Sequence, residues 1–356
     1  AADLEYVKDK ALDFHKTQVL KDAIVRSAQI LERDGDVEEI KLLVDDAMKA
    51  GTERNLGHDY LEDFEERYSE TARITTPTPW DIINELMQGG LGQGELGVVV
   101  APAGIGKSWV LSGMGAYAIS QGKNVVHYTL ELNESYVGLR YDSIFSGVEG
   151  QNLMYHKEEV LEKVEQIKGD LTIKYYPTRS CTVNTLSAHI KKATSFGAEV
   201  DMILVDYADI MRDVGKSTEM RHQLGNIYED LRGLAGEMQI PIWTASQANR
   251  SALDEDVIDA SKVAESYAKV MTADFVISVS RKIEDKIANT GRFHVIKNRF
   301  GPDGLTYPAK INTNIGKIEL FESTSTQGKE VQSKIRSRDN QTKQMLSARY
   351  EDLMSD

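Results

Sequence analysis

The spacing of apolar residues changes character near residue 80. Before it, apolar side chains recur every three or four positions among dense mixed charge, which predicts two or more helices with solvated outer faces within residues 1–50. An Asp-Gly-Asp sequence at 34–36 is expected to separate them. After residue 80, short apolar runs alternate with longer segments at helical spacing. This alternation is typical of a parallel sheet with helices on both faces.

An acidic helix is predicted between these two regions, over residues 58–72. Its apolar positions fall on one face, and the segment is isolated on both sides, so we expect a linker helix that docks on something else. Pro77 and Pro79 follow it and end the helical region. The apolar stripe consists of Tyr60, Leu61, Phe64 and Tyr68.

Strands and helices are predicted in alternation from residue 80 onward. The predicted parallel strands are apolar runs at 98–100, 124–131, 171–176, 202–206, 240–246 and 273–280. The predicted helices cover 109–120, 134–145, 157–168, 182–196, 218–238 and 260–271. Antiparallel strands joined by glycine-containing turns are predicted at 292–299, 305–312 and 317–321. The predicted fold class is therefore α/β, with a mostly parallel central sheet and C-terminal antiparallel strands.

These elements divide the chain into four predicted parts. Residues 1–56 form a helical N-terminal segment, 57–79 the linker helix and a hinge, 80–323 the α/β domain, and 324–356 a polar C-terminal tail. The first residue is alanine rather than methionine, which predicts a fragment whose natural start is missing.

Composition narrows the class of protein. Apolar residues make up 41% and charged residues 28% of the 356, as in globular proteins, and no apolar run approaches the ~20 residues of a membrane span. The single cysteine, Cys181, excludes a disulfide framework and a cysteine-based zinc module, which fits a cytoplasmic setting. The net charge of −14 argues against a broad basic surface that wraps duplex DNA, although local basic loops can still bind nucleic acid.

The most specific motif for a functional site follows the strand at 98–100, where the sequence of residues 101–108 is APAGIGKS. A strand, a loop of small residues, Lys-Ser and a helix form a phosphate-binding loop, because backbone N–H groups and the helix N-terminus converge on an anion. Lys107 is expected to reach the β- and γ-phosphates, and the Ser108 hydroxyl to ligand Mg²⁺. Ala101 replaces the motif's first glycine and is tolerated only where φ is not positive. The residues expected to contact the nucleotide are Ala103, Gly104, Ile105, Gly106, Lys107, Ser108 and Trp109.

Three polar residues end predicted strands and are candidates for chemistry at the phosphates. Asp206 ends an apolar strand in the form of a Walker B element and would orient Mg²⁺, the alternative being a structural strand cap. Glu131 ends the strand at 124–131 and is the candidate group that polarises the attacking water, unless it is a surface glutamate. Gln247 would sense the γ-phosphate, with an ordinary polar strand end as the alternative.

Lys297 and Arg299 alternate along a predicted strand and therefore point to the same face. Two neighbouring cations repel one another unless an anion lies between them. A solvated strand edge, where lysine deters aggregation, explains them equally well. The residues alone leave both explanations open.

Several motifs together give a family resemblance. With them the chain, from about residue 57 to 321, resembles the hexameric replicative DNA helicases of the DnaB-like, RecA-fold class, particularly those of tailed phages. The resemblance implies a RecA-like P-loop NTPase that uses ATP and Mg²⁺. The motifs are APAGIGKS, LEL around Glu131, ILVDY at 203–207, TASQ ending at Gln247, AES at 264–266, AD at 273–274 and IKNRFG at 296–301.

The resemblance also implies contacts between subunits. Lys297 and Arg299 would reach across a subunit boundary, with Arg299 acting as an arginine finger on the neighbour's nucleotide. The acidic helix at 58–72 matches the linker that packs against an adjacent subunit. The resemblance also implies that the family's full N-terminal collar is either shortened to residues 1–56 or absent.

Two loops, 213–222 and 250–267, are implied by the resemblance to face DNA in a central channel. Family members often carry arginine and glycine where this chain has Ala264 and Tyr267. The residues assigned to DNA are Lys216, Arg221, Arg250, Lys262, Ala264, Glu265 and Tyr267.

The site residues and the resemblance together predict an ATP-driven replicative DNA helicase motor that forms a ring, expected to be of six subunits. It would travel 5′ to 3′ on single-stranded DNA and unwind the duplex, in the cytoplasm of a bacterial or phage-infected cell, with primase and a helicase loader as candidate partners. A RecA-type filament ATPase or scaffold, which assembles on DNA without unwinding it, is one alternative. A KaiC-like ATPase that acts on protein, and would show no dependence on DNA, is another. The predicted catalytic residues are Glu131, Lys107, Asp206, Gln247, Arg299 and Lys297.

Overall fold

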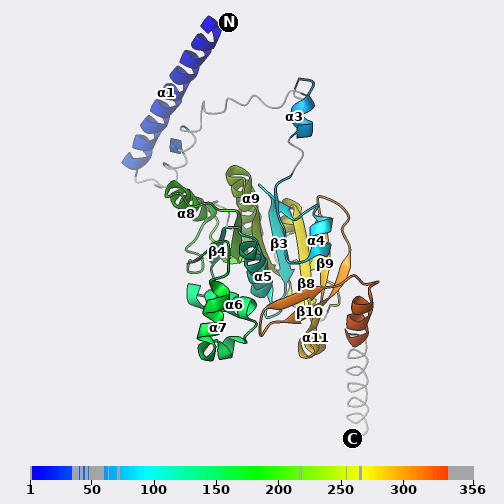
Figure 1. The fold of residues 1–356 in the computed structure, drawn as a ribbon. Helices are drawn as coiled ribbons and strands as arrows, with labels where there is room; N and C mark the ends of the chain where they lie inside the picture. Colours follow the sequence, from blue (N-terminus) through cyan, green and yellow to red (C-terminus); the bar gives the residue numbers. More distant parts are fainter. Residues whose placement is uncertain are drawn as a thin grey trace, which may run out of the picture. The chain divides into compact units, whose positions relative to one another are not determined.

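The chain forms two compact units, Ala1–Ala72 and Arg73–Asp356, and the second contains the sheet (Figure 1). None of the helices among the described residues combines the length and apolar character that crossing a bilayer requires. The computed structural model describes residues 2–33, 40, 43, 44, 47, 60–62, 64–69, 73–215, 217, 219–253, 255–263 and 267–335.

The first unit contains a helix in the predicted N-terminal segment and a short helix in the predicted linker. Helix α1 (Ala2–Glu32) confirms the first N-terminal helix and ends just before the predicted break at 34–36, which lies outside the described residues. Helix α3 (Phe64–Ser69) is the described helical part of the predicted 58–72 segment. Residues 58, 59, 63 and 70–72 of that segment lie outside the described residues.

A nine-stranded sheet forms the centre of the second unit, in the order β11-β10-β9-β8-β3-β7-β6-β4-β5. Strands β8 to β5 in this order run parallel, and β9, β10 and β11 are antiparallel, as the sequence predicts. The strands are β3 (Leu96–Ala101), β4 (Val125–Thr129), β5 (Leu171–Tyr175), β6 (Met202–Asp206), β7 (Ile242–Gln247), β8 (Phe275–Ser280), β9 (Thr290–Asn298), β10 (Thr306–Asn312) and β11 (Lys317–Leu320), with β1 (Thr75–Thr76) and β2 (Leu91–Gly92) in a small separate sheet.

Most helices of the second unit agree with the sequence prediction to within a few residues. The α-helices are α4 (Asp81–Leu86), α5 (Lys107–Ser120), α6 (Glu134–Ser146), α7 (Lys157–Val164), α8 (Val183–Ser195), α9 (Met220–Met238), α10 (Ala268–Thr272) and α11 (Ile283–Ala288). Short 3₁₀ turns are η1 (Gly150–Tyr155), η2 (Ala208–Ile210), η3 (Arg250–Ala252) and η4 (Ala260–Lys262).

The predicted continuous helix over 260–271 is wrong. Its start is only the turn η4, capped by the Asp259 carboxylate, which accepts a hydrogen bond from Ser261 N at 2.8 Å. Val263 then pairs with Ala248 in an antiparallel bridge instead of continuing a helix. The α-helical part begins at α10. Pairing of the chain with the end of β7 therefore outweighs local helix propensity here.

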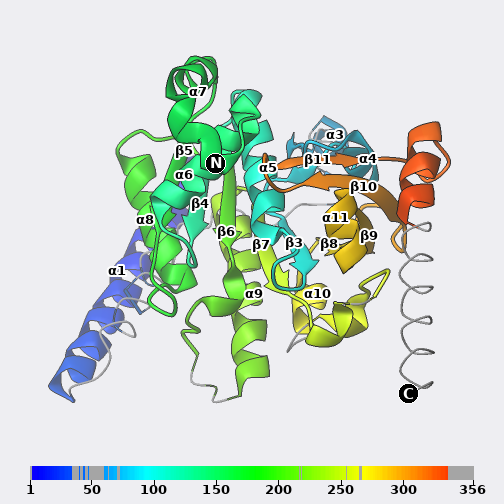
Figure 2. The same cartoon turned by 90° about the horizontal axis from the view of Figure 1, so that it is seen from below.

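Two apolar layers cover the sheet, and the alternation of side chains along β3 separates them. Val98 and Val100 face the cluster formed with α8 and α9, whereas Val99 and Ala101 face the cluster formed with α4, α5 and α6. Helices α5 and α9 thus lie on opposite faces, as Figures 1 and 2 show. Because β3 is buried on both sides, its carboxyl end is held rigidly.

The structure describes the first part of the C-terminal segment predicted over 324–356. Residues 326–335 are helical, and Val331 and Ile335 on this helix are buried. Residues 336–356 of the predicted tail lie outside the described residues.

Packing at β3 gives a first testable prediction. A methyl group added at Gly97 would lie 2.4 Å from the ring of Trp243, which is fully buried and pairs with Gly97 from the neighbouring strand β7. Gly97→Ala is therefore expected to lower the free energy of unfolding by ~1–3 kcal/mol, measured by urea denaturation. Gly113→Ala is the matched control, since it lies inside α5 with no described heavy atom within 4 Å of the added carbon. It should be neutral or stabilising by up to ~1 kcal/mol. Equal stability of the two variants would contradict the packing argument.

Candidate nucleotide-binding site

The carboxyl ends of β3, β4, β6 and β7 meet at one edge of the parallel sheet and open into a cavity of about 330 Å³. This is the edge at which open α/β sheets bind ligands. The cavity brings together most of the predicted nucleotide and catalytic residues, from three separate segments of the chain. It is lined by Pro102, Ala103, Gly104, Gly106, Lys107, Ser108, Trp109, Glu131, Leu132, Arg140, Tyr207, Gln247 and Thr313.

The loop between β3 and α5 has the backbone that close approach to phosphates requires. Gly104 and Gly106 adopt φ values of 72° and 115°, in the left-handed region that favours glycine. Ala101 is the last residue of β3 and has no such φ, which explains why alanine is accepted there. No side chain caps the N-terminus of α5, so its first N–H groups remain available to an anion.

Lys107 is the first residue of α5, and its amino group lies 4.9 Å from the centre of the Tyr207 ring. Burial lowers the pKa of this amino group, while the carboxylates of Asp206, Asp209 and Glu131 act in the opposite direction. A partly desolvated cation surrounded by carboxylates is well suited to binding polyphosphate, which replaces water as its partner.

Asp206 ends β6 and is 2% exposed, with Oδ1 buried and without a hydrogen-bond partner among the described residues. Burial raises the pKa of its carboxyl group, and a hydrogen bond from the Ser108 hydroxyl and the charge of Arg140 oppose this. A carboxylate with an unused buried oxygen beside a serine hydroxyl fits a Mg²⁺ site of the P-loop type. Among the described residues, no cluster of three histidine, cysteine or acidic side chains offers another metal site.

Glu131 lines the cavity but does not end a strand, contrary to the prediction. Strand β4 stops at Thr129, whose hydroxyl donates a hydrogen bond to the carbonyl oxygen of Leu132 at 2.7 Å and accepts one from Leu132 N at 3.2 Å. This local turn places the Glu131 side chain on an exposed loop that faces the cavity. Gln247 also lines the cavity, at the end of β7 as predicted.

Ile105 differs from the other predicted nucleotide contacts. Its side chain is 1% exposed and packs in the apolar cluster with α5, and it does not line the cavity. The residue therefore fixes the loop to the core, and only its backbone remains as a possible nucleotide contact.

Arg140 is a cavity residue that the sequence analysis did not identify. It comes from α6, and its guanidinium carbon lies 5.4 Å from the centre of the Trp109 ring. Its Nη1 atom is buried and has no hydrogen-bond partner among the described residues. Burial lowers the pKa of this guanidinium, whereas Asp206 and Glu131 raise it. The site therefore holds a second cation near its carboxylates.

Thr313 was missed as well, because it lies in the turn between β10 and β11, far from the loop in sequence. A side chain at Gly106 would come within 3.5 Å of its methyl group. This hairpin therefore covers one side of the phosphate-binding loop.

Lys297 and Arg299 do not line the cavity of their own chain. The Lys297 amino group donates hydrogen bonds to the carbonyl oxygens of Val270 and Met271, at 3.0 and 2.5 Å. Arg299 follows the end of β9 and pairs with Asp274, with Nη1 and Oδ1 2.5 Å apart. The Arg299 side chain is 54% exposed, so it remains accessible to a neighbouring molecule.

Few of the predicted DNA contacts can be placed. Lys216, Ala264 and Glu265 lie outside the described residues, as does the side chain of Arg250. Arg221 and Tyr267 are exposed, and Lys262 donates a hydrogen bond to Glu255 at 2.8 Å. The bridge between Ala248 and Val263 closes the base of the second predicted DNA loop.

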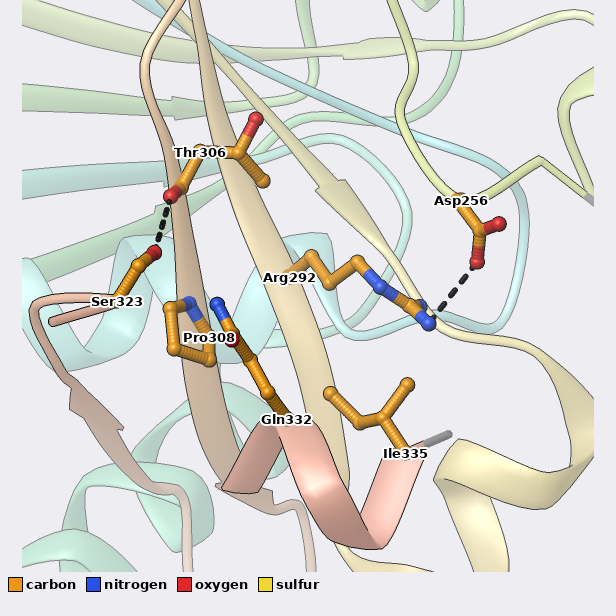
Figure 3. Close-up of a pocket in the computed structure, with 7 residues that line it drawn as sticks. All are labelled: Asp256, Arg292, Thr306, Pro308, Ser323, Gln332 and Ile335. Carbon is orange, nitrogen blue, oxygen red and sulfur yellow. Dashed lines mark hydrogen bonds and ion pairs between the residues drawn. The ribbon is translucent and has the colours of Figure 1, made fainter. Parts of the chain in front are cut away.

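A second hollow, of about 280 Å³, lies between β9, β10 and the helix at 326–335 (Figure 3). Its cation, Arg292, already pairs with Asp256 and with Asp285, each at 2.9 Å. The Ser323 hydroxyl donates a hydrogen bond to the carbonyl oxygen of Thr306. Since its cation is already paired with two carboxylates, this hollow lacks the features of a phosphate site.

Parts of this chain are similar to known proteins. A family described as "DnaB-like helicase C terminal domain" matches residues 77–317. The DnaB-like replicative helicase of Enterobacteria phage T4 is 29% identical over 288 residues, covering 75% of this chain and 59% of that protein. The chain thus spans about three fifths of that relative's length.

Two solved structures share the fold. One, described as an ATPase domain, aligns with a TM-score of 0.62 and 16% identity, covering 73% of this chain and 96% of that chain. The other, a DnaB-like replicative helicase described with its interactions with primase, aligns with a TM-score of 0.64 and 15% identity, covering 84% of this chain and 76% of that chain. At these identities the similarity shows the fold alone.

Proposed function

The chain belongs to the DnaB-like helicase C-terminal domain family, and from this premise we propose that it is the ATP-driven motor of a replicative DNA helicase. The observation that carries the proposal is the convergence of Lys107, Ser108, Glu131 and Gln247 around one cavity at the carboxyl edge of the sheet. Asp206 does not line the cavity itself but lies next to it, hydrogen-bonded to Ser108. These side chains supply the parts that phosphoryl transfer from ATP needs.

Within one subunit the proposed roles follow from position and charge. Lys107 and the N–H groups of α5 bind the β- and γ-phosphates, and Glu131 accepts a proton from the attacking water. Ser108 and Asp206 would hold Mg²⁺, which when bound neutralises charge on the phosphate oxygens. Gln247 senses the γ-phosphate.

We also propose that each site is completed by the next subunit of a ring, which we expect to contain six copies. Arg299 is exposed, lies outside its own cavity and is anchored through Asp274, so it can be presented to a neighbour's nucleotide. Its guanidinium would meet the charge that develops on the transferring phosphoryl group, and Lys297 would support it.

In the proposed ring, each of the other segments of the chain also has a role. Residues 80–323 form the motor and 57–79 a linker that packs on an adjacent subunit. Residues 1–56 form a helical N-terminal segment in the position of a collar, and 324–356 form a C-terminal segment. The loops at 213–222 and 250–267 bind single-stranded DNA. A primase is a candidate partner because a solved structure of the same fold is described with one, and a helicase loader is another.

Single-stranded DNA provides the test of this function. ATP hydrolysis should rise when single strands are added, with little preference for sequence, because the DNA contacts come from loops and from backbone charge. Binding should weaken with salt, with a slope of about −0.7 for each phosphate neutralised. Hydrolysis that is indifferent to single strands, or binding that ignores salt, would contradict the motor. A strand-displacement assay and particle images with a non-hydrolysable nucleotide separate a ring helicase from a DNA-binding filament without unwinding activity.

A further inference from the structure

A buried ion pair lies next to the nucleotide site, between the end of β7 and helix α10. Lys269 is 1% exposed, and its amino group lies 2.9 Å from Oδ1 of Asp209. Asp209 also accepts a hydrogen bond from the Tyr228 hydroxyl at 2.8 Å. A lysine this deeply buried is costly unless it is paired, and here the Asp209 carboxylate supplies the opposite charge.

The same carboxylate holds the residue proposed to sense the γ-phosphate. Oδ2 of Asp209 accepts a hydrogen bond from Gln247 N at 3.0 Å. The Lys269 amino group also donates to the Ser246 hydroxyl at 3.2 Å. The end of β7 and helix α10 are therefore joined by one set of charge-assisted hydrogen bonds.

Helix α10 is joined on its other side to Lys297, which is proposed to support Arg299 at the neighbouring subunit's nucleotide. Lys297 donates to the carbonyl oxygens of Val270 and Met271, the two residues that follow Lys269. These carbonyls belong to the last turn of the helix and would otherwise lack helical partners. A shift of α10 would therefore carry the Lys297 side chain with it.

From these contacts we propose that Lys269 is a positioning residue, which ties Lys297 through α10 to the strand end that carries Gln247. The inference rests on the proposed function and adds a regulatory route to it. Binding or loss of a subunit's own γ-phosphate at Gln247 is transmitted through Asp209, Lys269 and α10 to Lys297, which supports Arg299 at the neighbour's nucleotide. Neighbouring sites of the ring are thereby coupled through contiguous contacts.

A double-mutant cycle on kcat tests the proposal in the full chain with single-stranded DNA present. Lys297→Met is expected to lower kcat about 100-fold and Lys269→Met about tenfold. If Lys269 acts through Lys297, the double variant should be within about threefold of Lys297→Met alone. Thermal unfolding of each variant shows whether it is folded, and Lys286→Met, at an exposed position on α11, is the matched control.

The outcomes separate the possible failures. Two effects that simply multiply, about 1000-fold in the double variant, would show that Lys269 acts independently and would overturn the inference. Full activity of Lys297→Met would also overturn it. If Lys269→Met does not fold, the pair Lys269→Met/Asp209→Asn removes both buried charges together and takes its place in the cycle. A wild-type protein that hydrolyses no ATP would instead overturn the proposed function, and the inference with it.

Discussion

Replacing Lys107 with alanine is expected to reduce ATP hydrolysis by at least ~10³-fold and to abolish tight nucleotide binding. Lys107 is the cation supplied by the phosphate-binding loop, and it is held in the cavity among the carboxylates of Asp206, Asp209 and Glu131. Without it, these carboxylates would repel the phosphates. Arg140 cannot take over, because it approaches from α6 on the side of Trp109. Binding of a fluorescent ATP analogue and release of phosphate measure the two effects.

The matched control is Glu131→Gln, which keeps the size of the side chain and removes its charge. It should retain nucleotide binding, while hydrolysis falls by about 10²–10⁴-fold because only activation of the water is lost. Hydrolysis at the wild-type rate in Glu131→Gln would show that another group polarises the water. Tight binding by Lys107→Ala would contradict the assignment of the loop.

The fold was predictable where local pattern and tertiary environment agree. The run of apolar residues that ends at Asp206 predicts a buried strand, and strand β6 has the predicted bounds. Because buried parallel strands are apolar on both faces, they can be recognised in the sequence as continuous apolar runs. The 260–271 segment shows the opposite case, since helical spacing there yields to the bridge between Ala248 and Val263, which joins residues distant in sequence.

The same distinction applies to the site. Lys107, Ser108 and Asp206 belong to motifs whose spacing reflects a fixed backbone, and the structure brings them together. Arg140 carries no such signal. It is one arginine on an amphipathic helix, and it becomes a cavity residue because α6 packs against α5. Lys269 is similar, because a lysine in a short helix is expected to be exposed until its buried partner Asp209 is known.

A mixture of two inactive variants is expected to recover ATP hydrolysis if Arg299 acts on the neighbouring subunit. A subunit with Arg299→Ala keeps its own phosphate-binding loop but cannot complete its neighbour's site, and the loss is expected to be about 10³–10⁵-fold. A subunit with Lys107→Ala has the opposite defect. Each variant assembled alone should be nearly inactive.

Mixed one to one with confirmed subunit exchange, about one interface in four would join an intact loop to an intact finger, since the two halves come from adjacent subunits of a head-to-tail ring. About a quarter of the wild-type hydrolysis rate should therefore return when sites act independently, and less when they must act in order. DNA unwinding need not return, because a ring that fires in sequence stalls at the first dead interface. The control mixture of Lys107→Ala with Glu131→Gln should stay inactive, because both defects lie on the same side of the interface. If Arg299 acted within its own subunit, neither mixture could form a complete site, and hydrolysis no greater than the sum of the two variants would exclude the shared site.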